Sequence, residues 1–283
     1  FCTPAELDEI RQKQEQNKEN PGYYGRYAVH RDLPFEEAEK QIRAGRPWVL
    51  RFKSMGDPSR RFVIEDLVKG RLELPENDVD HVMLKSDGIP TYHFAHLVDD
   101  RLMRTTHVVR GDEWLATLPL HVELHGAIGW TPPRYLHISP VMKNDGGGKR
   151  KLSKRKDPEA AMSYYHAEGY PAEAVREYTM TLLNSNFEEW RAAHPAADLF
   201  DFPFTTEKMS ASGALFDLLK LRDISKNIIA AMSAGRVLEL MLRWAEIYDA
   251  ELFGLLSGDR DKAQAILSIG RGGEKPRKDL AAW

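Results

Sequence analysis

The sequence between residue 91 and about residue 160 alternates segments of helical and of strand character. Its first segment, TYHFAHLVDDRLM, repeats apolar residues at helical spacing and places Phe94, Val98 and Leu102 on one predicted apolar face. Two predicted strands follow, on either side of a long predicted helix capped by Asp112: HVVRG and RYLHISPVM. Such alternation is typical of a parallel α/β sheet, of which this stretch supplies about half.

The stretches on either side have a different character. Residues 3–16 begin with a Thr cap followed by Pro, which predicts a helix, and residues 34–45 predict a second helix that stops at Gly45. Strands are predicted in PWVLRFK, RRFVIEDLV and HVMLK, and beyond residue 160 nearly every segment is helical. The predicted fold class is α/β plus all-α: a partial parallel sheet, with an α+β region before it and a helical region after it.

The composition excludes several classes of protein. The single cysteine, Cys2, excludes an intramolecular disulfide and a zinc site built mainly from thiolates, and it fits a reducing, cytoplasmic location. Because no run of about 18 apolar residues is present, we expect no membrane span. The sequence begins with Phe1 and shows no signal peptide, which leads us to expect a fragment or a processed product.

Positive charge is concentrated between Lys143 and Lys156. This segment holds seven Lys and Arg residues and one acid, whereas the net charge of the whole chain is −3. Three consecutive glycines predict a flexible loop after a sheet strand, which is a common place for anion binding. Lys151 and Lys154 flank Ser153 and suit a triphosphate, although the spacing is not that of a P-loop. From charge alone, a solvated basic loop or a nucleic-acid contact without chemistry is the alternative.

Five ordered segments resemble one family. KLSKR, residues 151–155, resembles the KMSKS signature of class I aminoacyl-tRNA synthetases, and its surroundings resemble bacterial-type glutamyl-tRNA synthetases. The other four segments match that family in order and spacing: KSDGIPTYHFAHLVDD, HVVRGDEWL, SGALFDLLKL and GEKPRKDLAAW. The resemblance implies a Rossmann-type sheet in a ligase that activates glutamate with ATP and Mg²⁺ and transfers it from glutamyl-adenylate to tRNA(Glu).

The resemblance implies catalytic roles in the basic segment. Lys151, Ser153 and Lys154 match the signature whose lysines stabilise the ATP phosphates during adenylate formation. Catalysis of this kind depends mostly on positioning and on preorganised cations. Trp114 matches a residue near the adenine of ATP, with a place in the core as the alternative.

The resemblance also implies a glutamate site made of Tyr92, His96 and Arg110. Arginine suits a carboxylate because its planar fork can donate two parallel hydrogen bonds. The alternative for Arg110 is a surface ion pair with Asp112 or Glu113. The alternative for His96 is a hydrogen-bonded helix histidine.

Other charged and metal-binding side chains have weaker claims. The Asp99–Asp100 pair either holds Arg110 or the substrate amine, or ends the helix in solvent. His121 and His125 are one helical turn apart, but no third ligand is evident, so we expect packing rather than metal binding. Some members of the family bind zinc through cysteines; because Tyr27 stands where a cysteine often is, we expect no zinc.

The resemblance divides the chain into four parts. It implies an acceptor-end-binding insertion (1–86), the second half of the catalytic domain (87–156), a helical stem-contact domain (157–235) and the start of an anticodon-binding domain (236–283). The family's opening half-sheet with its HIGH-like motif is not present, so this chain alone is expected to be inactive. Residues 270–279 form a basic connector that either contacts tRNA or serves as a linker.

Other functions stay open at this point. A non-discriminating form would also charge tRNA(Gln), and a non-catalytic tRNA-binding module would use the basic loop and the helical end as a contact surface. A base-modifying relative is disfavoured by the helical region after residue 170. We expect a monomer whose partners are tRNA(Glu), glutamate and ATP.

Overall fold

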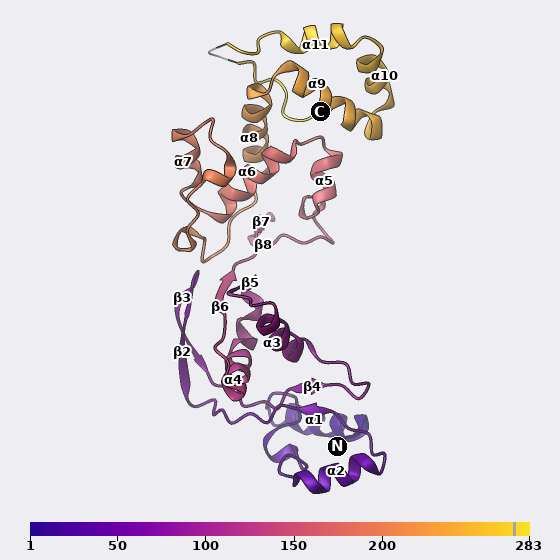
Figure 1. Cartoon of the computed structure of the whole chain (residues 1–283), viewed down its shortest axis with the longest axis vertical. Helices are drawn as coiled ribbons and strands as arrows, with labels where there is room; N and C mark the ends of the chain where they lie inside the picture. The colour runs from indigo at the N-terminus through magenta and orange to yellow at the C-terminus, as the bar shows by residue number, and fades with distance from the viewer. Residues whose placement is uncertain (274–275) are drawn as a thin grey trace. The chain divides into compact units, whose positions relative to one another are not determined.

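The computed structural model describes residues 1–273 and 276–283 (Figure 1). Glu274 and Lys275, which belong to the GEKPRKDLAAW segment and to the predicted connector, lie outside the described residues. The chain divides into two compact units, Phe1–His137 and Ile138–Trp283. The predicted division into four parts stays a prediction.

The first unit combines short helices with the main sheet of the chain. Its elements in chain order are α1 (Pro4–Gln16), η1 (Gly25–Tyr27), α2 (Phe35–Arg43), β1 (Leu50–Arg51), β2 (Arg61–Asp66), β3 (Gly70–Pro75), β4 (Val82–Leu84), α3 (Tyr92–Leu102), β5 (His107–Gly111), η2 (Asp112–Thr117), α4 (Leu118–Ile128) and β6 (Arg134–Ile138).

The sheet of the first unit has the strand order β3-β2-β6-β5. β2 runs antiparallel to β3 and parallel to β6, where Asp66 lies opposite Tyr135. A partly parallel sheet with helices beside it confirms the predicted fold class. β3 was not predicted, and it extends the sheet as the partner of β2 in a long hairpin (Figure 1).

Helices α3 and α4 supply the core beside this sheet. The buried cluster consists of Met83, Leu97, Leu120 and Leu124. The prediction that Leu102 lies on the apolar face is wrong, because that side chain is 75% exposed while Leu97 is 1% exposed. The prediction that one helix begins at an Asp112 cap is also wrong, since Asp112 opens a 3-10 helix and α4 begins only at Leu118.

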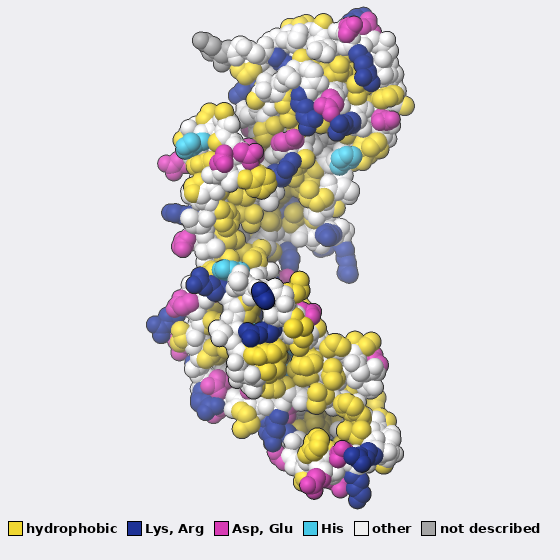
Figure 2. Space-filling model, viewed as in Figure 1, with side chains coloured by type: hydrophobic (Ala, Val, Ile, Leu, Met, Phe, Trp, Pro, Cys, Tyr) yellow, Lys and Arg dark blue, Asp and Glu magenta, His cyan; other side chains and the backbone are white. Residues whose placement is uncertain are grey.

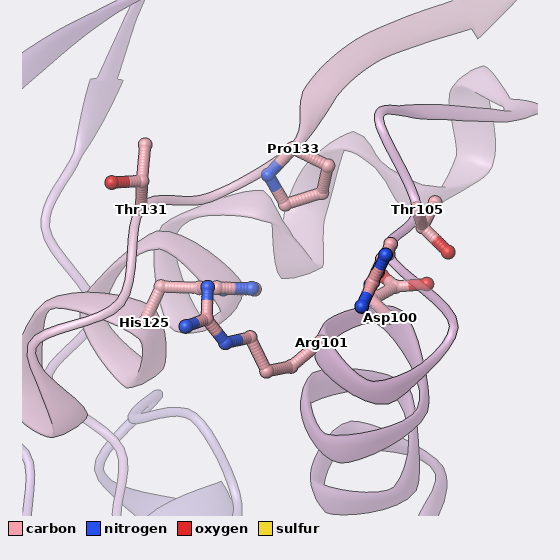
Figure 3. Close-up of a pocket in the computed structure, with 7 residues that line it drawn as sticks. Asp100, Arg101, Thr105, His125, Thr131 and Pro133 are labelled. Atoms are coloured by element: carbon pink, nitrogen blue, oxygen red, sulfur yellow. The ribbon is translucent and has the colours of Figure 1, made fainter.

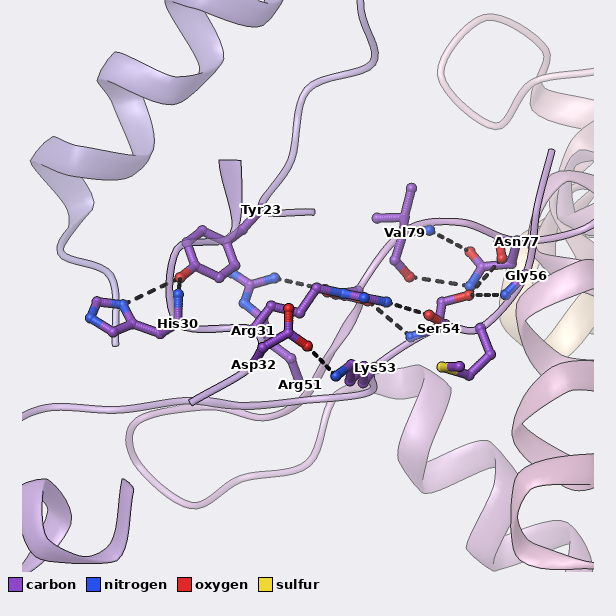
Figure 4. Close-up of polar contacts among 12 residues, drawn as sticks. Tyr23, His30, Arg31, Asp32, Arg51, Lys53, Ser54, Gly56, Asn77 and Val79 are labelled. Atoms are coloured by element: carbon purple, nitrogen blue, oxygen red, sulfur yellow. Dashed lines mark hydrogen bonds and ion pairs between the residues drawn. The ribbon is translucent and has the colours of Figure 1, made fainter. Parts of the chain in front are cut away.

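The N-terminal part of this unit follows its sequence signals closely. The Thr3 side chain accepts from the Glu6 backbone and Glu6 bonds back to Thr3, so α1 begins with the predicted cap. Buried polar contacts tie this part to β1 and β4. The Asp80 carboxylate accepts from Arg31 Nε at 2.6 Å and from the Ser54 backbone at 2.9 Å. Figure 4 shows how Arg31 and Ser54 lie in the surrounding polar network.

The second unit is helical beyond residue 160, as predicted, and before that it contains one hairpin that was not predicted. Its elements are β7 (Met142–Asn144), β8 (Lys149–Lys151), η3 (Pro158–Ala160), α5 (Met162–Ala167), α6 (Ala172–Leu183), α7 (Phe187–Ala193), η4 (Leu199–Asp201), η5 (Thr206–Lys208), α8 (Leu218–Ala231), α9 (Ala234–Tyr248), α10 (Ala250–Gly258) and α11 (Arg260–Ser268). One core gathers around Tyr178 and Leu221, and another around Leu238 and Leu242. Among the described helices, none is long and apolar enough to cross a membrane.

Candidate functional site

Aromatic rings gather at the N-terminal end of α3. The ring of Tyr92 lies 4.8 Å from that of Trp114 and stacks on His96 at 5.7 Å, centroid to centroid. Tyr92 is 49% exposed, so one side of this group is open to a ligand. The structure therefore brings together three residues that the sequence assigned to the glutamate and adenine sites.

Arg110 joins this group from the end of β5. The residue is 9% exposed, its Nε donates to His137 Nε2 at 2.8 Å, and its Nη1 donates to His121 Nδ1 at 2.9 Å. The guanidinium also lies 5.1 Å from the centre of the Tyr135 ring. Burial is the main cause that lowers the pKa of Arg110 from its ordinary value, although Tyr135 and Tyr92 oppose it.

One nitrogen of the buried guanidinium, Nη2, has no hydrogen-bond acceptor among the described residues. The alternative of a surface ion pair with Asp112 or Glu113 is wrong: Arg110 is buried between two histidines, and Asp112 pairs with Lys69 at 3.2 Å. Since a buried charge is costly unless it is paired, this arrangement suits an incoming carboxylate.

His96 makes a local pair within α3. Its Nδ1 lies 2.9 Å from Asp100 Oδ2, and its side chain is 7% exposed. Burial lowers the pKa of His96, and the neighbouring Asp100 acts in the opposite direction. The expectation that Asp100 holds Arg110 is not met, because this carboxylate faces His96. His96 can be either a glutamate contact or a hydrogen-bonded helix histidine, because its Nε2 has no partner within the described part of the chain.

Four residues behind Arg110 were not assigned to the site from the sequence: Asp66, His121, Tyr135 and His137. The sequence placed His121 one turn before His125 on the same helix, and from this we expected packing rather than metal binding. In the structure, His121 contacts Arg110 and His93, the latter at 3.0 Å. Within the described residues, no group of three or more His, Cys, Asp or Glu side chains could hold a metal ion.

The basic segment of the second unit is a hairpin. β7 and β8 are antiparallel, with Met142 opposite Lys151 and Asn144 opposite Lys149. The turn between them is closed by a hydrogen bond from the Asp145 backbone to Gly148 at 2.9 Å. The sequence predicted a loop here, because glycine and lysine are poor strand formers; the structure confines the loop to the turn.

Asp157 holds the end of this hairpin. Its carboxylate accepts from Arg150 at 2.6 and 2.7 Å, from the Ser153 backbone at 2.9 Å and from Lys143 at 3.3 Å. The Arg150 guanidinium is the main cause of the lowered pKa of Asp157. Asp157 precedes the 3-10 helix η3 but does not cap it with its side chain, which bonds to the hairpin instead.

The positive charge of the segment is therefore partly neutralised by the acid that directly follows it. Arg150 and Lys143 face Asp157, whereas the exposed Lys154 has no ion pair with any described residue. On the face shown in Figure 2, Lys and Arg side chains lie among Asp and Glu side chains and do not merge into one basic surface.

A polar hollow of about 400 Å³ lies elsewhere on the first unit (Figure 3). Its lining comes from the end of α3, from α4 and from the segments that follow them: Asp100, Arg101, Arg104, Thr105, His125, Thr131 and Pro133. None of the seven site residues assigned from the sequence lines it, so this hollow does not replace the site around Arg110.

Comparisons with known proteins point to one family. Residues 1–222 match the family described as tRNA synthetases class I (E and Q), catalytic domain. Over 280 residues the chain is 55% identical to a glutamate–tRNA ligase from Acetivibrio thermocellus, covering 99% of this chain and 51% of that protein. The glutamate–tRNA ligase of Clostridium beijerinckii is 52% identical over 283 residues, which is 100% of this chain and 51% of the relative.

A solved structure is also similar. It is a glutamate tRNA ligase from Elizabethkingia meningosepticum in complex with its amino acid, with a TM-score of 0.69 at 28% sequence identity. The match covers 93% of this chain and 57% of that chain. The present chain thus spans about half the length of the curated relatives it matches.

Proposed function

The chain belongs to the class I tRNA synthetases for glutamate and glutamine, and we propose that it acts within a glutamate–tRNA ligase. Such a ligase activates glutamate with ATP and transfers it to tRNA(Glu). The observation that carries the proposal is the buried Arg110 with an unpartnered Nη2 beside an open ring of Tyr92. The names of the similar ligases support glutamate as the amino acid.

Arg110, Tyr92 and His96 are the proposed glutamate-binding residues. A guanidinium that is already fixed by two histidines loses little freedom when a carboxylate binds, so the binding free energy is not spent on ordering it. Tyr92 offers a half-exposed ring and hydroxyl next to this cation. His96 presents a buried imidazole on the same helix, one turn further on.

Lys151, Ser153 and Lys154 are the proposed catalytic residues for adenylate formation. ATP brings Mg²⁺, and the lysine ammonium groups stabilise the charge that moves onto pyrophosphate. Asp157 supports this role, because it fixes the Ser153 backbone and neutralises Arg150, so the KLSKR turn has a defined shape. Trp114 is the proposed neighbour of the adenine.

We propose that each of the four predicted parts of the chain has the role that the resemblance implies. Residues 1–86 bind the tRNA acceptor end, 87–156 complete the catalytic sheet, 157–235 contact the tRNA stem and 236–283 open the anticodon-binding region. The protein is proposed to be a cytoplasmic monomer. Because the similar ligases are about twice as long, we expect residues 1–283 alone to activate little glutamate.

The test is charging of tRNA(Glu) by the complete protein that contains this chain, with Arg110→Lys as the variant. Lysine keeps the charge but lacks the fork, so the KM for glutamate should rise about 10- to 100-fold, the scale of a hydrogen bond to a charged group. Arg101→Lys, on α3, is the matched control and should leave this KM unchanged. An Arg110→Lys enzyme with the wild-type KM contradicts the assignment, and parallel assays with tRNA(Gln) show whether it is also charged.

A further inference from the structure

A continuous line of hydrogen bonds crosses the sheet of the first unit behind Arg110. Asp66 ends β2, His137 lies on β6 and Arg110 lies on β5, and these strands are neighbours in the order β2-β6-β5. Asp66 Oδ2 lies 2.7 Å from His137 Nδ1, and His137 Nε2 accepts from Arg110 Nε at 2.8 Å. The Asp66 and His137 side chains are each 0% exposed, so water does not compete for these bonds.

The arginine determines where the protons of this line lie. Arginine only donates, so His137 Nε2 must be the bare acceptor and the ring proton must be on Nδ1, from which it is donated to Asp66. Because arginine only donates, the proton of His121, on the other side of Arg110, is fixed in the same way. Arg110 Nη1 donates to His121 Nδ1, which leaves the His121 proton on Nε2, facing His93 Nδ1 at 3.0 Å.

The carboxylate of Asp66 is held in one orientation by the backbone. Oδ1 accepts from the Val68 and Lys69 backbone at 3.0 and 2.8 Å, in the turn between β2 and β3. Oδ2 faces His137, where it accepts from the backbone N–H at 3.1 Å and lies 2.7 Å from the ring Nδ1. Burial by itself raises the pKa of Asp66, but the bonds from His137 and from the turn outweigh it and lower the pKa.

We propose that Asp66 and His137 are positioning residues of the amino-acid site: they fix the direction of the Arg110 guanidinium so that Nη2 points to the substrate carboxylate. This inference rests on the proposed function. Neither residue touches the substrate; each acts through Arg110. The device works because an imidazole with its proton on Nδ1 is the one neutral form that can both donate to Asp66 and accept from Arg110.

The first experiment reads the proton position directly. Residues 1–283 are produced with ¹⁵N-labelled histidine rings, and the His137 signals are identified by comparison with a His137→Gln sample. The proposal predicts a neutral ring with the proton on Nδ1. A proton on Nε2, or a cationic ring, overturns it, whatever reaction the protein catalyses.

The second experiment changes the proton position in the complete protein. In Asp66→Asn the amide oxygen keeps the bonds from the Val68 and Lys69 backbone, so the amide nitrogen takes the place of Oδ2. It then loses the bond from the His137 backbone and donates to the ring Nδ1. The ring proton then moves to Nε2, opposite the Arg110 N–H. The KM for glutamate should rise about 10- to 100-fold while the KM for ATP stays within about 2-fold, since only the carboxylate-binding group is misdirected.

Asp80→Asn is the matched control, because Asp80 is an equally buried carboxylate in the same unit, bonded to Arg31 instead of a histidine. It should leave the KM for glutamate unchanged. A second pair of variants keeps the proposal testable if Asp66→Asn does not fold. The amide oxygen of His137→Gln can still accept from Arg110, whereas His137→Leu has no acceptor. The KM for glutamate should therefore rise less in His137→Gln than in His137→Leu.

The outcomes separate the two proposals. If the wild-type protein does not charge tRNA(Glu), the proposed function fails and the ring measurement still decides whether the hydrogen-bond line exists. If it does charge, and Asp66→Asn matches Asp80→Asn while His137→Leu keeps the wild-type KM, the positioning role is overturned and the ligase assignment stands.

Discussion

Acidification is expected to destabilise the first unit through His121. This residue is 1% exposed and must stay neutral to accept from Arg110. Burial, and then the nearby His96 and Arg110, lower its pKa from 6.5 to about 2. The perturbation is therefore a fall in pH, compared between the wild type and His121→Gln, which has no titrating ring.

The magnitude follows from proton linkage. In the unfolded chain His121 takes up a proton as the pH falls below 6.5, whereas the folded unit does not until about pH 2. The unfolded state therefore binds more protons in this window, and stability is lost as the pH falls. At about pH 5 the difference is roughly 1.5 pKa units, or about 2 kcal/mol of unfolding free energy relative to about pH 7.5.

Amide hydrogen exchange in α3 and α4 measures this free energy for the first unit by itself. His121→Gln is expected to be less stable at neutral pH, because it disturbs the bond to Arg110. The gap between the two proteins should narrow by about 2 kcal/mol at about pH 5. His107→Gln removes an exposed histidine of the same unit and should show no such change. If the unfolding free energies of the wild type and of His121→Gln change with pH in parallel, His121 is not the cause of the acid destabilisation.

The remaining predictions concern the ATP site and metal content. In the complete protein, with tRNA present, Lys154→Ala should slow glutamate-dependent ATP–pyrophosphate exchange at least ~10²-fold, the scale of losing a preorganised charge stabiliser. Lys156→Ala removes an exposed cation outside the signature and should change the exchange rate little. If both variants exchange at the same rate, the catalytic role proposed for Lys154 is wrong. Elemental analysis of the purified protein should find no stoichiometric zinc, because Tyr27 stands at the position where the family resemblance leads us to expect a cysteine in zinc-binding members, and its hydroxyl donates to Glu19 at 2.6 Å. One zinc per chain would contradict this prediction.

Local signals predicted much of the fold. The Thr3 cap, the stop at Gly45 and the strand His107–Gly111 depend on neighbouring residues, so the sequence contains what determines them. The sequence did not determine which face of α3 is buried, because this helix has apolar residues on more than one side. The packing of α4 selected Leu97 and left Leu102 in solvent.

Residues of the proposed site could be assigned from the sequence where residue type and family resemblance coincide. The residues behind Arg110 could not, because tertiary pairing brings them there. Tyr92, Trp114 and Arg110 were assigned from the sequence, and the structure places them together. Asp66 and His137 were not, since they are 71 residues apart in the chain and meet only through the pairing of β2 with β6. No local pattern reports such a contact.

The most direct test of the account is the structure of the complete protein with glutamate bound. We predict that a carboxylate of glutamate lies within hydrogen-bond distance of Arg110 Nη2, with His137 and His121 still on the other guanidinium nitrogens. Glutamate bound elsewhere, with Arg110 turned to a carboxylate of the protein itself, would contradict it.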